Sequence, residues 1–233
     1  MKNENDFKIF LFVGFKKLVI TALNSNNQNI YKKELLNNNS LGSLNFDIIN
    51  KFLEENIFNI EKALNKFVNN IFLIIDHNDF FSVDLSLKKK TNVNQVKNDH
   101  INSLLIEAKN QCKKTLENNK IIHLKIDKFI IDNIEYSSLP KKICCNNFAI
   151  DVSFICLPCN LIKKYEKIFS KYQIYMSRII SYRYLCEFLK SKEDDIFEVA
   201  VKILNGVNEN EVLLINKSQV NKGFFEKFFS YFN

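Results

Sequence analysis

Residues 7–23 read FKIFLFVGFKKLVITAL, two apolar runs separated by Gly14. The runs 7–13 and 17–23 have the length and composition of β-strands, and Gly14 predicts a tight turn between them. Residues 24–43 are polar and rich in Asn, although 30–36 could pair as a further strand. The segment therefore predicts a β-hairpin, with an optional third strand, as the start of the fold.

A long amphipathic helix is predicted next, followed by a buried strand. Apolar residues recur every three or four positions over 46–67, and Asn45 is a suitable N-cap. Residues 71–75 are a short, fully apolar run of the kind found in strands covered on both faces. The order strand, strand, optional strand, helix, strand is typical of an α/β fold with a mixed sheet.

A second unit begins near Phe80. Alternating apolar residues predict strands at 81–87, 122–127 and 148–156. A helix over 93–116, with Asn92 and Gln95 as a capping-box-like start, lies between the first two. A loop at 133–147 and a helix at 161–172 complete a small β-α-β-β-α unit. We expect residues 80–172 to be an α+β domain inserted into the first one.

The chain then returns to the first pattern. A strand at 174–181 and a short helix at 182–189 are predicted, with a helix at 196–204 capped by Asp195 and Glu198 and ended by Asn205-Gly206. We therefore expect a base domain formed by 1–79 and 173–206. Residues 207–221 lack a clear period and are predicted to be a flexible tether.

The last twelve residues, 222–233, read KGFFEKFFSYFN. On a helix the five phenylalanines fall within an arc of about 140°, a stripe typical of helices that lie in the membrane interface. The alternative is a helix docked on its own domain or on a partner. We expect this helix to bind an anionic membrane surface through Lys222, Phe224, Phe225, Lys227, Phe228, Phe229 and Phe232.

The formal net charge is +7, but only two of the 33 basic residues are Arg. Because Arg supplies the bidentate contacts to phosphates and guanine, nucleic-acid binding is not expected. Residues 1–6 carry acids where a signal peptide is basic, and no apolar run reaches the length of about 18 residues that a transmembrane helix needs. We therefore expect an intracellular protein whose six cysteines are reduced.

Three groups could carry chemistry. Cys156 and Cys159 form a CxxC pair between a strand and a helix, as in thioredoxin-like redox sites, but the preceding element order differs from that fold. A zinc site would need Cys144 and Cys145 as well, and their spacing matches no standard ligand set, so no metal is expected. Asp76, His77 and Asp79 follow a strand end, where α/β sheets hold ligands, although such a cluster is more often a solvated loop. No enzyme activity is expected.

The order of these pieces resembles the bacterial FtsA family of cell-division proteins, within the actin/Hsp70 ATPase superfamily, in strongly reduced form. Residues 11–17 lie where that family has its first phosphate motif, and 46–67 with 71–75 resemble its next helix and strand. Residues 80–172 resemble its inserted domain, with local matches at 122–124, Phe129, 131–132 and Pro140. Residues 200–204 and the Phe-rich terminus resemble its last helix and its membrane-targeting helix.

The sequence differs from that family at the residues that bind the nucleotide. Phe12 and Phe15 replace the acidic residue and the Thr of the phosphate motif, and only Gly14 remains. The second phosphate motif and the adenosine motif are missing, so no cofactor is expected. FtsZ is kept only as a possible partner, because the lobe that binds it in the family has no counterpart here.

The resemblance implies a partial actin-like (ribonuclease-H-like) mixed sheet, an inserted domain and a C-terminal amphipathic helix. The function it implies is a non-enzymatic cell-division scaffold, peripheral on the cytoplasmic side of the inner membrane at midcell. Such a protein would contact other division proteins and could associate with itself through an exposed apolar sheet edge. The alternatives are an adaptor of a pilus or secretion assembly, a thiol oxidoreductase and a binder of single-stranded nucleic acid.

Overall fold

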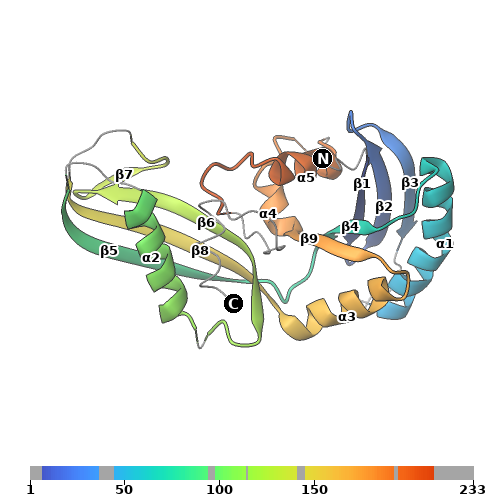
Figure 1. Cartoon of the computed structure of the whole chain (residues 1–233), viewed down its shortest axis with the longest axis horizontal. Coiled ribbons are helices and arrows are strands. Elements are labelled where there is room, and N and C mark those ends of the chain that lie inside the picture. Colours follow the sequence, from blue (N-terminus) through green and yellow to red (C-terminus); the bar gives the residue numbers. More distant parts are fainter. Residues whose placement is uncertain are drawn as a thin grey trace. The chain divides into compact units, whose positions relative to one another are not determined.

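A computed structural model describes residues 7–36, 45–93, 98–113, 115–140, 145–191 and 194–212 (Figure 1). The chain forms two compact units. Among the described residues, those within 7–80 and 157–207 form the base unit, and those within 81–156 and 208–212 form the inserted unit.

The base unit contains a five-stranded mixed sheet in the order β3-β2-β1-β4-β9. Its strands are β1 (Phe7–Val13), β2 (Lys17–Asn24), β3 (Asn29–Leu36), β4 (Asn70–Ile75) and β9 (Tyr175–Ser181). Strand β2 runs antiparallel to both β1 and β3, whereas β1, β4 and β9 are parallel. This order and these directions are those of the ribonuclease-H-like sheet of actin-like proteins, so the predicted fold class is confirmed.

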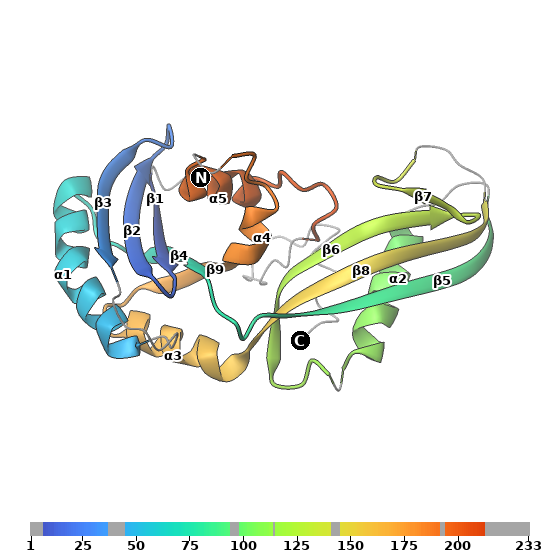
Figure 2. The same cartoon turned by 180° about the vertical axis from the view of Figure 1, so that it is seen from behind.

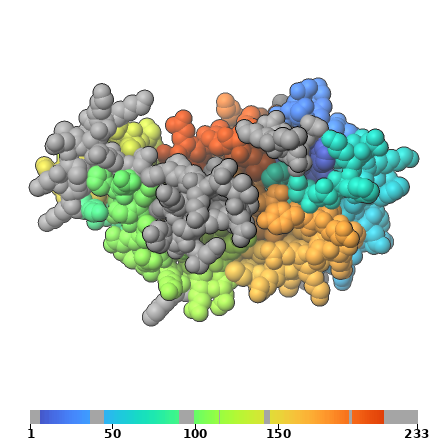
Figure 3. Space-filling model, viewed as in Figure 1, coloured from blue at the N-terminus to red at the C-terminus, as the bar shows by residue number. Residues whose placement is uncertain are grey.

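Helices cover both faces of this sheet (Figures 1 and 2). Helices α1 (Phe46–Leu64) and α3 (Cys159–Ser170) lie together on one face, where the rings of Phe46 and Tyr165 are 5.2 Å apart. They form one continuous surface in Figure 3. Helices α4 (Tyr182–Cys186) and α5 (Ile196–Leu204) lie on the other face, and Phe197 of α5 packs 5.9 Å from Phe10 of β1. The central strands are therefore buried on both sides, as their continuous apolar runs require.

Side-chain caps fix the helix boundaries of the base unit. The side chain of Asn45 accepts hydrogen bonds from the backbone N–H groups of Asp47 and Ile48, as predicted for α1. Asp195 accepts from the N–H of Phe197 at 2.8 Å and starts α5. Each cap satisfies N–H groups that the first helical turn leaves without a partner.

The inserted unit contains a four-stranded sheet in the order β5-β8-β6-β7, with α2 (Asn98–Gln111) on one face (Figures 1 and 2). Its strands are β5 (Phe81–Val93), β6 (Asn119–Ile131), β7 (Ile134–Tyr136) and β8 (Cys145–Pro158). Leu104, Leu105 and Ala108 of α2 pack against a core that includes Phe148, Ile150 and Phe154 of β8.

Several predicted boundaries differ from the structure. Asn92 lies within strand β5, so the predicted capping box at Asn92 and Gln95 is wrong, and α2 begins at Asn98. Helix α1 ends at Leu64, because Asn65 adopts a left-handed conformation with φ of 50°. Strand β7 lies inside the segment predicted as a loop.

The division into units also differs from the expected one, because helix α3 belongs to the base unit. The phenolic O–H of Tyr172, just beyond α3, donates to the backbone oxygen of Asn50 in α1 at 3.1 Å. Residues 208–212, the start of the expected tether, belong to the inserted unit and contact β6.

Candidate functional site

Three parallel strands of the base unit end side by side. The pairing aligns Val13 of β1 with Ile75 of β4, and Ile75 with Ser181 of β9. Gly14, Asp76 and Tyr182 therefore follow directly at the same edge of the sheet. Ligands of α/β sheets bind at such carboxyl ends, so this edge is the candidate site.

Aromatic rings fill the candidate site. The ring of Phe12 meets that of Tyr182 edge-on at 5.2 Å, and Phe15 stacks on the imidazole of His77 at 5.6 Å. The structure thus brings Phe12 and Phe15, the residues that replace the polar groups of the phosphate motif, into contact with the ends of β4 and β9.

Gly14 serves this aromatic packing. A Cβ atom placed on Gly14 would lie 2.7 Å from Cε1 of Phe12, so any other residue here would force the Phe12 ring or the backbone to shift. The N–H of Gly14 donates to the backbone oxygen of Lys17 at 3.0 Å and closes the hairpin. Gly14 therefore allows the Phe12 ring to approach the backbone, and its own N–H bonds within the turn.

The groups that follow β4 interact with the neighbouring strand ends. The backbone N–H of Asp76 donates to Val13 O at 2.9 Å. Burial raises the pKa of the Asp76 carboxyl, while the positive charge of Arg183 and then that of His77 partly lower it. Nδ1 of His77 lies 3.1 Å from the backbone nitrogen of Asp79 and 3.3 Å from Oδ2 of the same residue.

This geometry is poorly suited to nucleotide or metal chemistry. A phosphate clasp needs backbone N–H groups pointing into open space, and Mg²⁺ needs carboxylates that converge. At this edge the rings of Phe12 and Tyr182 contact each other, and Phe15 stacks on His77. Among the residues that the structure describes, no group of three His, Cys, Asp or Glu side chains is placed to hold a metal ion.

Cys156 of the CxxC pair lacks the features of a reactive redox thiol. Both are present as thiols, and Cys156 is fully buried. Burial, and secondarily the thiol of Cys112, raises the pKa of Cys156 to about 12. Because the thiolate is the nucleophile, a pKa this high opposes thiol–disulfide exchange at Cys156.

The inserted unit holds polar contacts that the sequence did not predict. Nδ1 of His123 lies 2.8 Å from Oε1 of Glu211, and both side chains are buried. Beside this pair the N–H of Ile126 donates to Asn210 O at 2.9 Å, and the N–H of Val212 donates to Leu124 O at 2.8 Å. Residues 210–212 therefore pair with β6. Because 88 residues separate His123 from Glu211, no local pattern could have indicated this contact.

The membrane-binding residues predicted at 222–233 lie outside the described residues, so the structure does not place them. Within the described ranges, no helix combines the length and the apolar character needed to cross a bilayer.

No family model and no curated protein matches the sequence. Solved structures with a similar fold include the cytoplasmic domain of EpsL, an inner membrane component of the type II secretion system of Vibrio cholerae (7% identity, TM-score 0.39, covering 80% of this chain and 59% of that one). Another is the PilM-PilN type IV pilus biogenesis complex (7% identity, TM-score 0.43, 76% and 48%). A third is a Bacteroides thetaiotaomicron protein with an actin-like ATPase fold and unknown function (14% identity, TM-score 0.31, 80% and 57%).

The chain thus spans about half to three fifths of the length of these structures. None of the three is described as a cell-division protein, and their scores are too low to carry an inference about function. The fold assignment rests on the strand order and directions of the base unit, which are ribonuclease-H-like.

Proposed function

We propose that this protein is a non-enzymatic adaptor of a membrane-associated assembly of the pilus or secretion type. The observation that carries the proposal is the aromatic closure around Gly14, where the ring of Phe12 fills the space beside the hairpin. The chain keeps an actin-like sheet, but at the carboxyl ends of its strands aromatic rings stand in place of the groups that would bind phosphate. The sheet then serves as a scaffold and not as a nucleotide site. Its role is then to bind other proteins.

The supporting chemistry is that of the replaced groups. Phe12 and Phe15 stand where a carboxylate and a hydroxyl would serve phosphate and Mg²⁺, and neither ring can donate or accept a conventional hydrogen bond. The stacking of Phe15 on His77 also occupies a face of that imidazole. The proposal therefore includes neither ATP hydrolysis nor a bound nucleotide.

The proposed location is the cytoplasmic face of the inner membrane. It rests on the Phe-rich segment 222–233, whose rings would enter the headgroup region while Lys222 and Lys227 contact anionic lipid. Confinement to that surface raises the effective concentration of partners without any new contact. The cell-division scaffold, with division proteins as partners, is the second candidate, since the order of sequence elements resembles FtsA.

Nucleotide binding tests the central claim. Titration of the full chain with ATP and Mg²⁺ in a calorimeter should give no saturable heat at concentrations up to about 1 mM, a binding free energy weaker than about −4 kcal/mol. Micromolar binding of ATP that depends on Mg²⁺ would refute the adaptor proposal in its non-enzymatic form.

Flotation tests the membrane contact. The full chain and a chain ending at Asn221 are mixed with phosphatidylglycerol vesicles, and only the full chain should float. A variant with Phe224→Ser and Phe228→Ser keeps the charge and should float poorly. Equal flotation of all three would remove the anchor from the proposal.

The position of a fluorescently tagged copy in the native cell separates the two candidates. An adaptor of a pilus or secretion assembly should gather with the components of that envelope machine and stay there when division is blocked. Recruitment to midcell that disappears when division is blocked would favour the division scaffold instead.

A further inference from the structure

Strand β3 is an exposed edge of the base-unit sheet. It stands first in the strand order, and β2 is its neighbour on one side only. Seven of its eight residues are exposed, among them Ile30 at 42% and Leu36 at 66%. A partly apolar edge strand presents unpaired backbone groups and readily pairs with another strand, and β3 carries one bulge, where its pairing with β2 skips Ile30.

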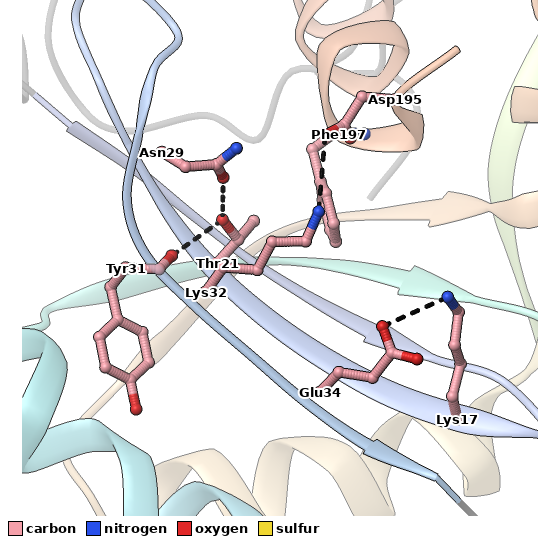
Figure 4. Close-up of polar contacts among 8 residues, drawn as sticks. All are labelled: Lys17, Thr21, Asn29, Tyr31, Lys32, Glu34, Asp195 and Phe197. Atoms are coloured by element: carbon pink, nitrogen blue, oxygen red, sulfur yellow. Dashed lines mark hydrogen bonds and ion pairs between the residues drawn. The ribbon is translucent and has the colours of Figure 1, made fainter. Parts of the chain in front are cut away.

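Contacts on both faces hold β3 in place, and Figure 4 shows the ion pair of Lys32 with Asp195 of the α5 face. On the α5 face, Nζ of Lys32 lies 3.7 Å from Asp195 and 5.5 Å from the centre of the Phe197 ring. On the α1 face, the phenolic O–H of Tyr31 donates to Oδ1 of Asn56 at 2.6 Å. These contacts favour the extended conformation of β3 before any partner binds, which lowers the entropic cost of pairing.

We propose that the occupant of this edge is a second copy of the same chain, joined by antiparallel β3–β3 pairing about a two-fold axis at Lys33. The inference goes beyond the adaptor function and does not depend on it. In this register Lys32 of each copy lies opposite Glu34 of the other, which gives two opposite-charge pairs on one face of the joined sheet.

An apolar pair forms in the same register. Tyr31 lies opposite Leu35 of the second copy, on the face away from the charge pairs. This pair occurs twice, because the interface is isologous. The exposed Leu35 is thus opposed by an aromatic ring, whereas Ile30 lies at a bulge in β3.

Neighbouring registers fit less well, because opposite residues must point to the same face of the sheet. Moving the axis to Lys32 opposes Lys32 to itself and Tyr31 to Lys33, and moving it to Glu34 opposes Glu34 to itself and Lys32 to Leu36. Neither of these registers forms an opposite-charge pair. At the proposed axis the only like-charge contact is Lys33 with itself, where two long exposed side chains can turn apart. Because each copy contributes its β3 edge to the same interface, no further copy can pair with that edge, and the assembly is a dimer.

Cross-linking tests the register directly. Directly opposite residues in an antiparallel pair have Cα atoms about 4.5–5.5 Å apart, within the range of a disulfide. Full-chain Lys33→Cys should therefore form a covalent dimer on mild oxidation, joined through residue 33 as shown by peptide mass spectrometry. Lys32→Cys is the matched control, because its two copies lie two residues out of step and beyond disulfide reach. Cross-linking of Lys33→Cys no faster than that of Lys32→Cys or the unchanged chain would overturn the proposal.

Charge reversal provides an independent test by sedimentation of the full chain. Glu34→Lys creates two Lys–Lys contacts and should weaken the dimer by about tenfold or more, whereas Glu34→Gln, which also removes the ion pair of Glu34 with Lys17 but adds no like charge, should weaken it less. Tyr175→Lys, on the opposite edge strand and 61% exposed, is the control and should leave the dimer unchanged. A chain that is monomeric throughout, or a dimer that only Tyr175→Lys weakens, would contradict β3 pairing.

Discussion

The imidazole of His123 and the carboxylate of Glu211 lie 2.8 Å apart, and the side chains of both are buried in the inserted unit. Through this contact and the hydrogen bonds beside it, residues 210–212 are fixed to strand β6. A buried pair of this kind is costly to break, because the group that remains loses its partner without regaining water.

Glu211→Leu should therefore lower the free energy of unfolding of the inserted unit by about 3–5 kcal/mol. The measurement is urea unfolding combined with hydrogen exchange, in which the amides of Ile126 and Val212 should lose protection first. Glu209→Leu removes an exposed carboxylate two residues away and should change stability by less than about 0.5 kcal/mol. Equal effects of the two substitutions would show that the buried pair is not what fixes this segment.

Gly14→Ala should destabilise the base unit by about 1–3 kcal/mol, because the added Cβ would collide with the ring of Phe12. The cost should fall sharply in a Phe12→Leu background, where the ring is absent, and thermal unfolding of the four chains of the cycle gives the coupling.

Gly206→Ala is the matched control for that cycle. Gly206 has a φ of +77° and no atom within 4 Å of its Cβ position, so alanine there should cost about 1 kcal/mol through the backbone alone. That cost should be the same with and without Phe12→Leu. If the cost of Gly14→Ala were equally independent of Phe12, the ring would not be the reason for the glycine.

Local sequence signals predicted most of the base unit. The apolar spacing and the Asn45 cap gave α1, and Asp195 with Asn205-Gly206 gave both ends of α5, because caps act on the nearest turn of backbone. The mixed sheet followed from the order of strand-like and helix-like segments. Its fifth strand, β9, was placed to within one residue.

The remainder depended on contacts between distant residues. Asn92 has the chemistry of an N-cap, yet pairing with β8 extends β5 through that position. Residues 208–212 show no spacing of apolar residues that would predict a helix or a strand. Their conformation depends on contacts with β6, more than 80 residues earlier in the sequence. At the candidate site the sequence identified Phe12, Gly14 and Phe15 but missed Tyr182 and Arg183, which β9 brings to the same edge.

Asp76→Asn should stabilise the protein at neutral pH. Burial raises the pKa of Asp76, so the folded state binds its proton more tightly than the unfolded state, and stability falls as the pH rises from the ordinary value near 3.9 through the raised one. The gain from Asp76→Asn should therefore be full at pH 7 and vanish below about pH 3.9 in urea unfolding across a pH series.

Asp194→Asn should show the opposite sign. Backbone hydrogen bonds from Lys190 and Ser191 lower the pKa of Asp194, so its contribution to stability is present at neutral pH and disappears as the pH falls through the lowered value. Asp194→Asn should destabilise the protein at pH 7 and match the unchanged chain in strong acid. Parallel pH profiles for the two variants would contradict the burial of Asp76.

Cys156 should react with iodoacetamide far more slowly than Cys159. A pKa of about 12 leaves almost no thiolate at pH 8, and the buried sulfur is also shielded from the reagent, whereas Cys159 is partly exposed. Timed alkylation of the native full chain, read by peptide mass spectrometry, should show a difference of at least about tenfold. In urea the two thiols should react at similar rates, which serves as the control. If Cys156 were instead the faster of the two in the native chain, the thiol oxidoreductase alternative would regain support, since an activated thiolate is what that chemistry needs.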